Sequence, residues 1–370
     1  MGSTTAFDRR IQAGPANVPL AVRDGDDSWA ELAERAAGWE ADRVLLVTDG
    51  AAPAEYLTRV RSVAAATAPC TALDLRSAPA PGRPPADPRA PAGRTVVVAV
   101  GGEQACAVAA DLRLPTTLAA AVGPALALRR PPPDARALPA RTAPALVWVR
   151  SDLLADRPAP ETRAGLIGVI RHVLAVCPAR YEALAGALDP EARYSASTVA
   201  AFLAVCADAR AALVCFDPYE TGPALALAYG RRLAAPVRSA AGHPLPPGDA
   251  EALGLLLAAR IAVRLGLLDA AGAWAHRELV ARNGSATGLP GGTDTEVLAD
   301  AVAAALADAV AAALADGSGL LLLAGLGRPY CAGGRLLTPV GAPLLRAAAE
   351  SLGPVAVPHC RRPVRALVTG

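Results

Sequence analysis

The chain contains no lysine, and all 36 of its basic residues are arginines. Without an ε-amine, no residue can form a Schiff base, shuttle a proton as lysine does, or pair with a phosphate as a compact point charge. Arginine does not take over proton transfer, because its guanidinium stays protonated. The absence therefore excludes lysine-based catalysis, whatever the fold.

Other features are scarce as well. The seven cysteines include no Cys-x-x-Cys pair, which argues against a disulfide framework or a zinc ribbon and favours buried, reduced thiols. The net charge of +2 comes with scattered arginines rather than a basic stripe, so we expect no nucleic-acid partner. Apolar runs end before about 18 residues and no signal-peptide pattern opens the chain, so we expect no membrane partner and a cytoplasmic location.

The first part of the chain alternates between strand and helix patterns. Residues 42–50 (DRVLLVTDG) and 94–102 (RTVVVAVGG) are β-branched apolar runs that end in turn residues, and a helical run over 53–67 lies between them. Strand, helix and strand in this order predict a parallel sheet, with a ligand crevice at the carboxyl ends of the strands.

Long helices dominate the rest of the chain, and 370 residues are enough for two cores. We place the domain boundary near Arg157, between an α/β domain of residues 1–157 and a helical domain of residues 158–370. The long helices are predicted over residues 161–177, 196–215, 249–268 and, in an alanine-rich repeat, 298–317. Proline-rich loops are predicted over residues 76–93 and 129–144.

Eight stretches of the chain form a set in a fixed order: VLLVTDGAAPAEYL, VVVAVGG, LPTTLAAA, PALVWVRSDLL, ETRAGLIGVIRH, DPYETGPALALAYG, GDAEALGLLLAARIAVRLGLL and LGRPYCAGGRLLTPV. Taken together, they resemble the sugar-phosphate cyclase family of 3-dehydroquinate synthase, and most closely its 2-deoxy-scyllo-inosose synthase branch. The resemblance implies a Rossmann-like α/β N-terminal domain that holds NAD and an all-α C-terminal domain that holds zinc or cobalt. It also implies a homodimer that forms a carbocycle from a sugar phosphate.

The metal ligands that the resemblance implies are replaced. Gly168, Arg231 and Pro247 stand at the three ligand positions, and none of these side chains offers a lone pair to zinc or cobalt. We therefore expect no metal. Ala235 stands at a further family histidine, while Arg171 and Arg210 stand at family lysines. The alternative is a remodelled metal site, which would use His172, His243 and Asp249.

The turn that would hold the dinucleotide is kept in part. Gly101 and Gly102 remain at the end of a strand, where backbone N–H groups of the family meet the pyrophosphate, but Glu103 replaces the third glycine. Asp49, Thr116 and Thr117 match further positions that contact NAD in the family. NAD is thus the candidate cofactor, and the alternative for these residues is a strand-end turn and a helix N-cap.

Arginines stand where the family clamps phosphate with lysines. A guanidinium binds phosphate well through its two-pronged geometry, so a pocket for a sugar phosphate or another anion is one interpretation. The other is that these arginines lie on solvated helix faces. The arginines that would line this pocket are Arg129, Arg130, Arg171, Arg210, Arg231 and Arg232.

Replacement of the catalytic parts within a kept scaffold is the pattern of a protein that has lost catalysis and retained its fold. Our leading hypothesis is a catalytically inactive cyclase homologue, paired with itself or with an intact cyclase, in aminocyclitol-type secondary metabolism. One alternative is an active, metal-independent lyase whose arginines assist conversion of a sugar phosphate. Another is a module that binds a sugar phosphate or anion without turnover.

Overall fold

The computed structural model describes most of the chain, in residues 6–14, 16–76, 93–111, 116–118, 144–240, 245–289 and 319–353. Several features predicted from the sequence lie outside these ranges. They are Arg129, Arg130, His243, the alanine-rich helix over 298–317 and nearly all of the two proline-rich loops.

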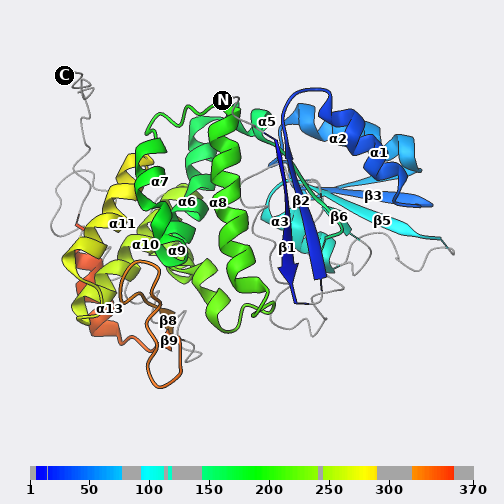
Figure 1. The fold of residues 1–370 in the computed structure, drawn as a ribbon. Coiled ribbons are helices and arrows are strands. Elements are labelled where there is room, and N and C mark those ends of the chain that lie inside the picture. Colours follow the sequence, from blue (N-terminus) through cyan, green and yellow to red (C-terminus); the bar gives the residue numbers. More distant parts are fainter. Residues whose placement is uncertain are drawn as a thin grey trace.

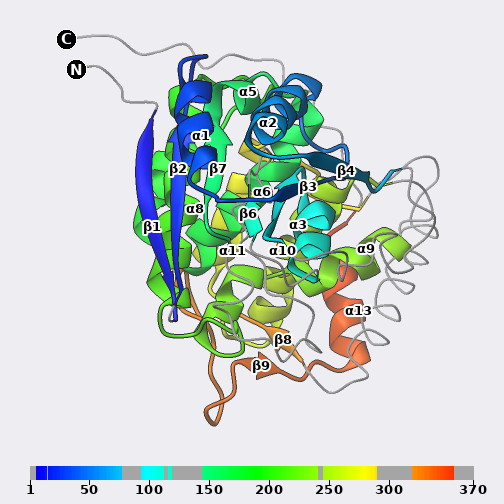
Figure 2. The ribbon, with the colours of Figure 1, turned by 90° about the vertical axis from the view of Figure 1, so that its right-hand side faces the viewer.

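A seven-stranded sheet forms the N-terminal part, in the order β1-β2-β7-β6-β5-β3-β4. Its neighbouring strands are parallel except for the antiparallel β1-β2 pair, and Figure 2 shows β1 at one edge and β4 at the other. The chain adds β4 on one side of β3 and then adds β5, β6 and β7 on the other side. The strand order therefore reverses between β3 and β5, and open α/β sheets bind ligands at such a reversal. The strands are β1 (Phe7–Ala13), β2 (Ala16–Arg23), β3 (Arg43–Thr48), β4 (Cys70–Asp74), β5 (Thr95–Val100), β6 (Thr116–Leu118) and β7 (Val147–Arg150).

Alternate side chains of the central strands enter two different cores, as the two-residue period of a strand requires. Val96 and Val98 of β5 pack under α1 (Ser28–Ala37) and α2 (Ala54–Thr67). Val97 of the same strand faces the opposite core, which includes α3 (Glu103–Asp111) and the long helices of the second half. Figure 1 shows these layers, with α1 and α2 on the side of the sheet away from the helical half.

The helical half is built around α10, which is buried along most of its length. A helix with apolar residues on all sides is stable only when other elements surround it, and α6, α9, α11 and α13 pack against this one. The helices are α5 (Ser151–Ala155), α6 (Ala159–Ala175), α7 (Tyr181–Ala187), α8 (Ala196–Val214), α9 (Ala234–Ala240), α10 (Pro247–Arg264), α11 (Ala270–Arg282) and α13 (Ala342–Glu350). Shorter elements are η2 (Pro178–Arg180), η3 (Pro223–Ala228), η4 (Arg231–Leu233), β8 (Leu320–Leu321) and β9 (Leu337–Thr338).

The fold class predicted from the sequence is confirmed, and so are the strands near residues 43–48 and 95–100. The third predicted helix ends earlier than expected, at Arg264, because Gly266 takes a left-handed φ of 69°. One hydrophobic core includes both Val149 of the sheet and Ile167 of α6, so residues on both sides of Arg157 pack into the same core. The domain boundary near Arg157 stays a prediction.

One described helix, α8, is long and apolar enough by composition to cross a membrane. Half of its most apolar window is buried inside the molecule, and core helices of soluble proteins pass the same test. The helix packs against α6, α5 and β1, which is the environment of a core helix.

Candidate functional site

Two glycines bring the turn that carries Arg231 onto α10. Gly230 has a φ of 72°, and a Cβ atom there would lie 2.9 Å from Cα of Leu255. A Cβ atom on Gly254 would lie 2.6 Å from the carbonyl oxygen of Gly230. Only glycine fits at both positions, and their contact places Arg231 at the surface of α10.

The start of α10 lies equally close to α6. A Cβ atom on Gly248 would lie 2.6 Å from Cα of Ala164, so the two helices touch through their backbones. Pro247 begins α10, a position where proline is favoured because no helical hydrogen bond needs its nitrogen. The three elements that carry Gly168, Arg231 and Pro247 therefore pack around one region.

Arg171 is buried in that region, with 6% of its surface exposed. Its Nε donates a hydrogen bond of 2.9 Å to the carbonyl oxygen of Tyr229, and its Nη2 donates one of 2.5 Å to Oε2 of Glu251. Sequence analysis missed Glu251. No local signal marks Glu251 as the partner, because the two residues are 80 positions apart in the chain.

The charge of Glu251 also acts on Arg231. Burial lowers the pKa of the Arg231 guanidinium, and the negative charge of Glu251 acts in the opposite direction. Gly168 is different, since a Cβ atom there would meet no atom of the described chain within 4 Å. Arg232 is exposed and donates to the carbonyl oxygen of Gly319, and Ala235 is exposed. The region thus holds two arginines around one glutamate.

Arg210 is also deeply buried, with 4% of its surface exposed. Its Nη2 pairs with Oε1 of Glu220 at 2.6 Å. Glu220 adopts a left-handed φ of 51° in a turn that Asp217 organises by accepting hydrogen bonds from the N–H groups of Gly222 and Ala224. Two members of the predicted anion pocket, Arg171 and Arg210, therefore already hold carboxylates of the chain itself.

His172, His276 and Asp249 are buried or hydrogen-bonded within the protein and are not arranged around a common metal position. Burial, with smaller effects from Arg171 and Arg210, lowers the pKa of His172 to about 3. Burial lowers the pKa of His276 to about 4, and its ring bonds the Gly272 carbonyl and the Tyr229 hydroxyl. Because a carbonyl only accepts, Nδ1 of His276 carries the proton and Nε2 accepts from Tyr229.

Asp249 accepts a hydrogen bond from the N–H of Ala286 through Oδ1. His243, the third member of the remodelled site, lies outside the described ranges. Within those ranges, no three histidine, cysteine, aspartate or glutamate side chains gather in a way that could hold a metal ion. The described residues of this region therefore do not fit a metal ion.

At the switch between β3 and β5, Asp49 closes the glycine turn. Its carboxylate accepts hydrogen bonds of 3.0 Å from the N–H groups of Gly102 and Ala51, and one of 3.1 Å from that of Ala105. A Cβ atom on Gly101, whose φ is 148°, would lie 2.1 Å from Oδ1 of Asp49. The N–H groups of Gly102 and Ala105 therefore already donate to a carboxylate of the chain itself, and NAD binding at this turn stays a prediction.

Thr116 and Thr117 lie in β6, whose backbone pairs with β5. The structure thus places these threonines in a strand beside the one that leads into the glycine turn, and not at the helix N-cap of the alternative interpretation; it describes their backbone only.

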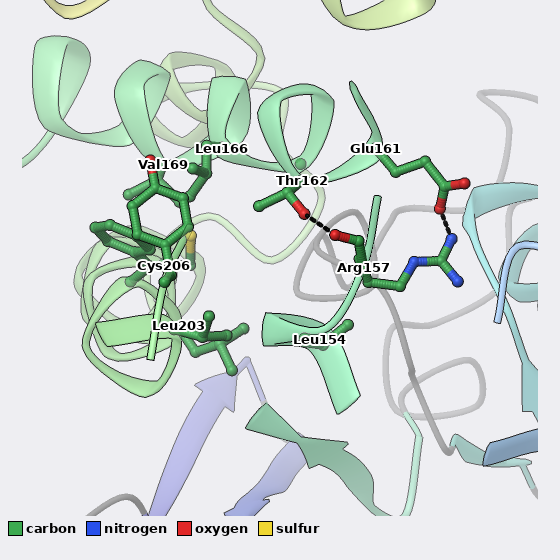
Figure 3. Close-up of a pocket in the computed structure, with 12 residues that line it drawn as sticks. Leu154, Arg157, Glu161, Thr162, Leu166, Val169, Leu203 and Cys206 are labelled. Atoms are coloured by element: carbon green, nitrogen blue, oxygen red, sulfur yellow. Dashed lines mark hydrogen bonds and ion pairs between the residues drawn. The ribbon is translucent and has the colours of Figure 1, made fainter. Parts of the chain in front are cut away.

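An apolar pocket that sequence analysis did not predict lies between α5, α6 and α8 (Figure 3). Leu154, Leu166 and Leu203 line it, with Cys206 deeper and the Arg157 and Glu161 ion pair to one side. Burial raises the pKa of the Cys206 thiol to about 12, so this thiol is inert. No sequence pattern marks the pocket, because its lining comes from separate helices with ordinary core residues.

No family model matches the sequence. The 2-deoxy-scyllo-inosose synthase of Streptomyces lividus is 30% identical over 209 residues, which cover 56% of this chain and 54% of that protein. That of Streptomyces fradiae is 35% identical over 159 residues, or 42% of this chain and 37% of that protein. The sequence matches therefore span about half or less of the length of these curated relatives.

A solved 2-deoxy-scyllo-inosose synthase, complexed with carbaglucose-6-phosphate, NAD+ and Co2+, superposes with a TM-score of 0.73. The two chains are 19% identical, and the superposition covers 93% of this chain and 99% of that one. The architecture is therefore that of the 3-dehydroquinate synthase-like fold, an α/β domain followed by a helical one. Over part of its sequence and over most of its fold, the chain is thus similar to 2-deoxy-scyllo-inosose synthases.

Proposed function

We propose that this chain is a catalytically inactive member of the sugar-phosphate cyclase family that acts as a partner or regulatory subunit. The observation that carries the proposal is the chemistry of the three ligand positions. Gly168, Arg231 and Pro247 supply no lone pair for a metal, and the space around them holds two arginines and a glutamate instead. A cation that polarises a carbonyl has no ligands in this arrangement.

Two further observations support the loss of turnover. The chain has no lysine for proton transfer, and Arg171 and Arg210, which stand at family lysine positions, are each paired with a carboxylate. At the turn between β5 and α3, where a dinucleotide phosphate would bind, the Asp49 carboxylate accepts hydrogen bonds from the N–H groups of Gly102 and Ala105. Metal, proton transfer and cofactor are thus all affected.

A partner role is supported by an exposed aromatic pair on a rigid turn. Phe216 is 88% exposed and Tyr219 is 44% exposed, in the turn that Asp217 and Glu220 organise. Aromatic side chains held on a preorganised loop are typical anchors of protein interfaces. The proposal includes pairing with a second copy or with an intact cyclase, in the cytoplasm and in aminocyclitol-type secondary metabolism.

The test combines native mass spectrometry of the protein from its own host with a turnover assay on glucose 6-phosphate and NAD, using an intact cyclase as positive control. We expect a pair that includes a lysine-containing cyclase chain or a second copy, and no product from this chain alone. The matched variant Phe216→Ala should weaken pairing, whereas Trp274→Ala, which removes another exposed aromatic side chain, should not.

A retained reaction is the main alternative, and Arg231 is the observation that favours it. A half-buried arginine at a position that the resemblance assigns to a metal ligand could assist conversion of a sugar phosphate without a metal. Product formed by the purified chain would establish that alternative and overturn ours. Thermal stabilisation by a sugar phosphate without product would instead indicate a binding module.

A further inference from the structure

A single guanidinium connects the three elements that carry the replaced ligand positions. Arg171 belongs to α6, one turn after Gly168. Its Nε reaches the Tyr229 carbonyl, just before η4, and its Nη2 reaches Glu251 in α10. Tyr229 and Glu251 are separated from Arg171 by 58 and 80 residues of chain, so these contacts join distant segments.

We propose that the pair of Arg171 and Glu251 is a built-in replacement for the structural work of the family's metal ion. A bound cation holds its ligands together by attracting their lone pairs. The Arg171 guanidinium is also a cation, and it attracts a carbonyl oxygen and a carboxylate from the two other elements. Because this cation is part of the chain, α6, η4 and α10 are held together with no metal at all.

The charges around Glu251 make the pair hard to break. The Arg171 side chain is 7% exposed and that of Glu251 is 30% exposed, so water screens the pair weakly. The negative charge of Glu251 also acts on Arg231. Loss of the Glu251 charge therefore leaves the buried charge of Arg171 uncompensated, which is strongly destabilising.

The first test compares the melting temperature of Glu251→Gln with that of Glu161→Gln. Glu161 also pairs with an arginine near α6, but its side chain is 47% exposed. We expect Glu251→Gln to lower the melting temperature by about 6 °C or more, and Glu161→Gln to lower it by about 2 °C or less. Equal effects of the two substitutions would overturn the proposal.

A double variant keeps the test decisive if Glu251→Gln alone does not fold. In Arg171→Gln/Glu251→Gln the buried charge of Arg171 is gone, and two amides remain that can bond each other and the Tyr229 carbonyl. The double variant should recover at least about half of the stability that Glu251→Gln loses. A double variant as unstable as the sum of both single variants would show that the two residues act independently, against the proposal.

Metal is tested directly on the wild-type chain. We expect its melting temperature to change by about 1 °C or less on addition of EDTA or of equimolar zinc or cobalt. A rise of more than about 3 °C with either metal would show that an ion performs the cross-link, and would overturn the proposal. These measurements use the purified chain alone, so their outcome is independent of the turnover and pairing tests of the proposed function.

Discussion

The glycine turn between β5 and α3 differs from the region around α10 in what holds it. The turn depends on backbone N–H groups, because those of Gly102 and Ala105 donate to the carboxylate of Asp49 at the end of β3. The region around α10 depends on side chains, because Arg171 pairs with Glu251 there. A turn that links a strand to a helix has a structural role with or without a ligand, whereas an ion pair depends on the identity of two side chains.

The largest effect is expected at Arg210 in the helical half. Arg210→Met leaves Glu220 mostly buried without its partner and should lower the free energy of unfolding by about 3–5 kcal/mol. Arg180→Met is the control, because Arg180 and Asp208 form an exposed pair that contributes about 1 kcal/mol or less. Urea denaturation measures both, and similar losses would mean that the buried pairs are not what holds this half together.

The glycine turn should resist substitution through geometry rather than charge. Gly101→Ala would place a Cβ atom 2.1 Å from Oδ1 of Asp49 and strain a φ of 148°, so we expect a loss of about 1–3 kcal/mol. Gly25→Ala is the control, since its φ is also positive, at 69°, but a Cβ atom there meets nothing within 4 Å. If both variants lose the same free energy of unfolding, the close contact with Asp49 does not contribute to the loss.

Acid should weaken the helical half through its buried histidines. Burial lowers the pKa of His172 to about 3, against about 6.5 in an unfolded chain. Between these values the unfolded chain binds the extra proton, so stability falls as pH falls from about 6.5 toward 3, by up to about 1.4 kcal/mol per pH unit. His172→Gln should flatten this slope in urea denaturation from pH 4 to pH 7. An unchanged slope would mean that His172 is not neutral and buried.

The smallest effect is expected at Gly168, the first of the three positions where the resemblance implies a metal ligand. Gly168 lies inside α6, and a Cβ atom there would meet no described atom within 4 Å. Gly168→Ala should therefore raise the free energy of unfolding by about 0.5–1 kcal/mol, through helix propensity. Gly248→Ala should lower it, because its Cβ atom would lie 2.6 Å from Cα of Ala164. A destabilised Gly168→Ala would show that this space is filled.

Much of the fold follows from local patterns, while the partners of the site residues do not. Apolar periodicity predicts β3, β5, α2, α6 and α8 because each depends on neighbouring residues. The β1-β2 hairpin was not predicted, and nor were the pairings of Arg171 with Glu251 and of Arg210 with Glu220. The first pair is separated by 80 residues, and nothing local marks a carboxylate as the partner of one arginine among 36.

The sequence by itself determined that no lysine is present and that the side chains of Gly168, Arg231 and Pro247, where the resemblance implies metal ligands, offer no lone pair. Both statements follow from residue identity alone. Only the tertiary structure decided what the remaining groups do, because charges act over a few ångströms in space rather than along the chain. It is the packing of α6, η4 and α10 that sets Arg171 against Glu251, and the meeting of β3 and β5 that sets Asp49 on the glycine turn.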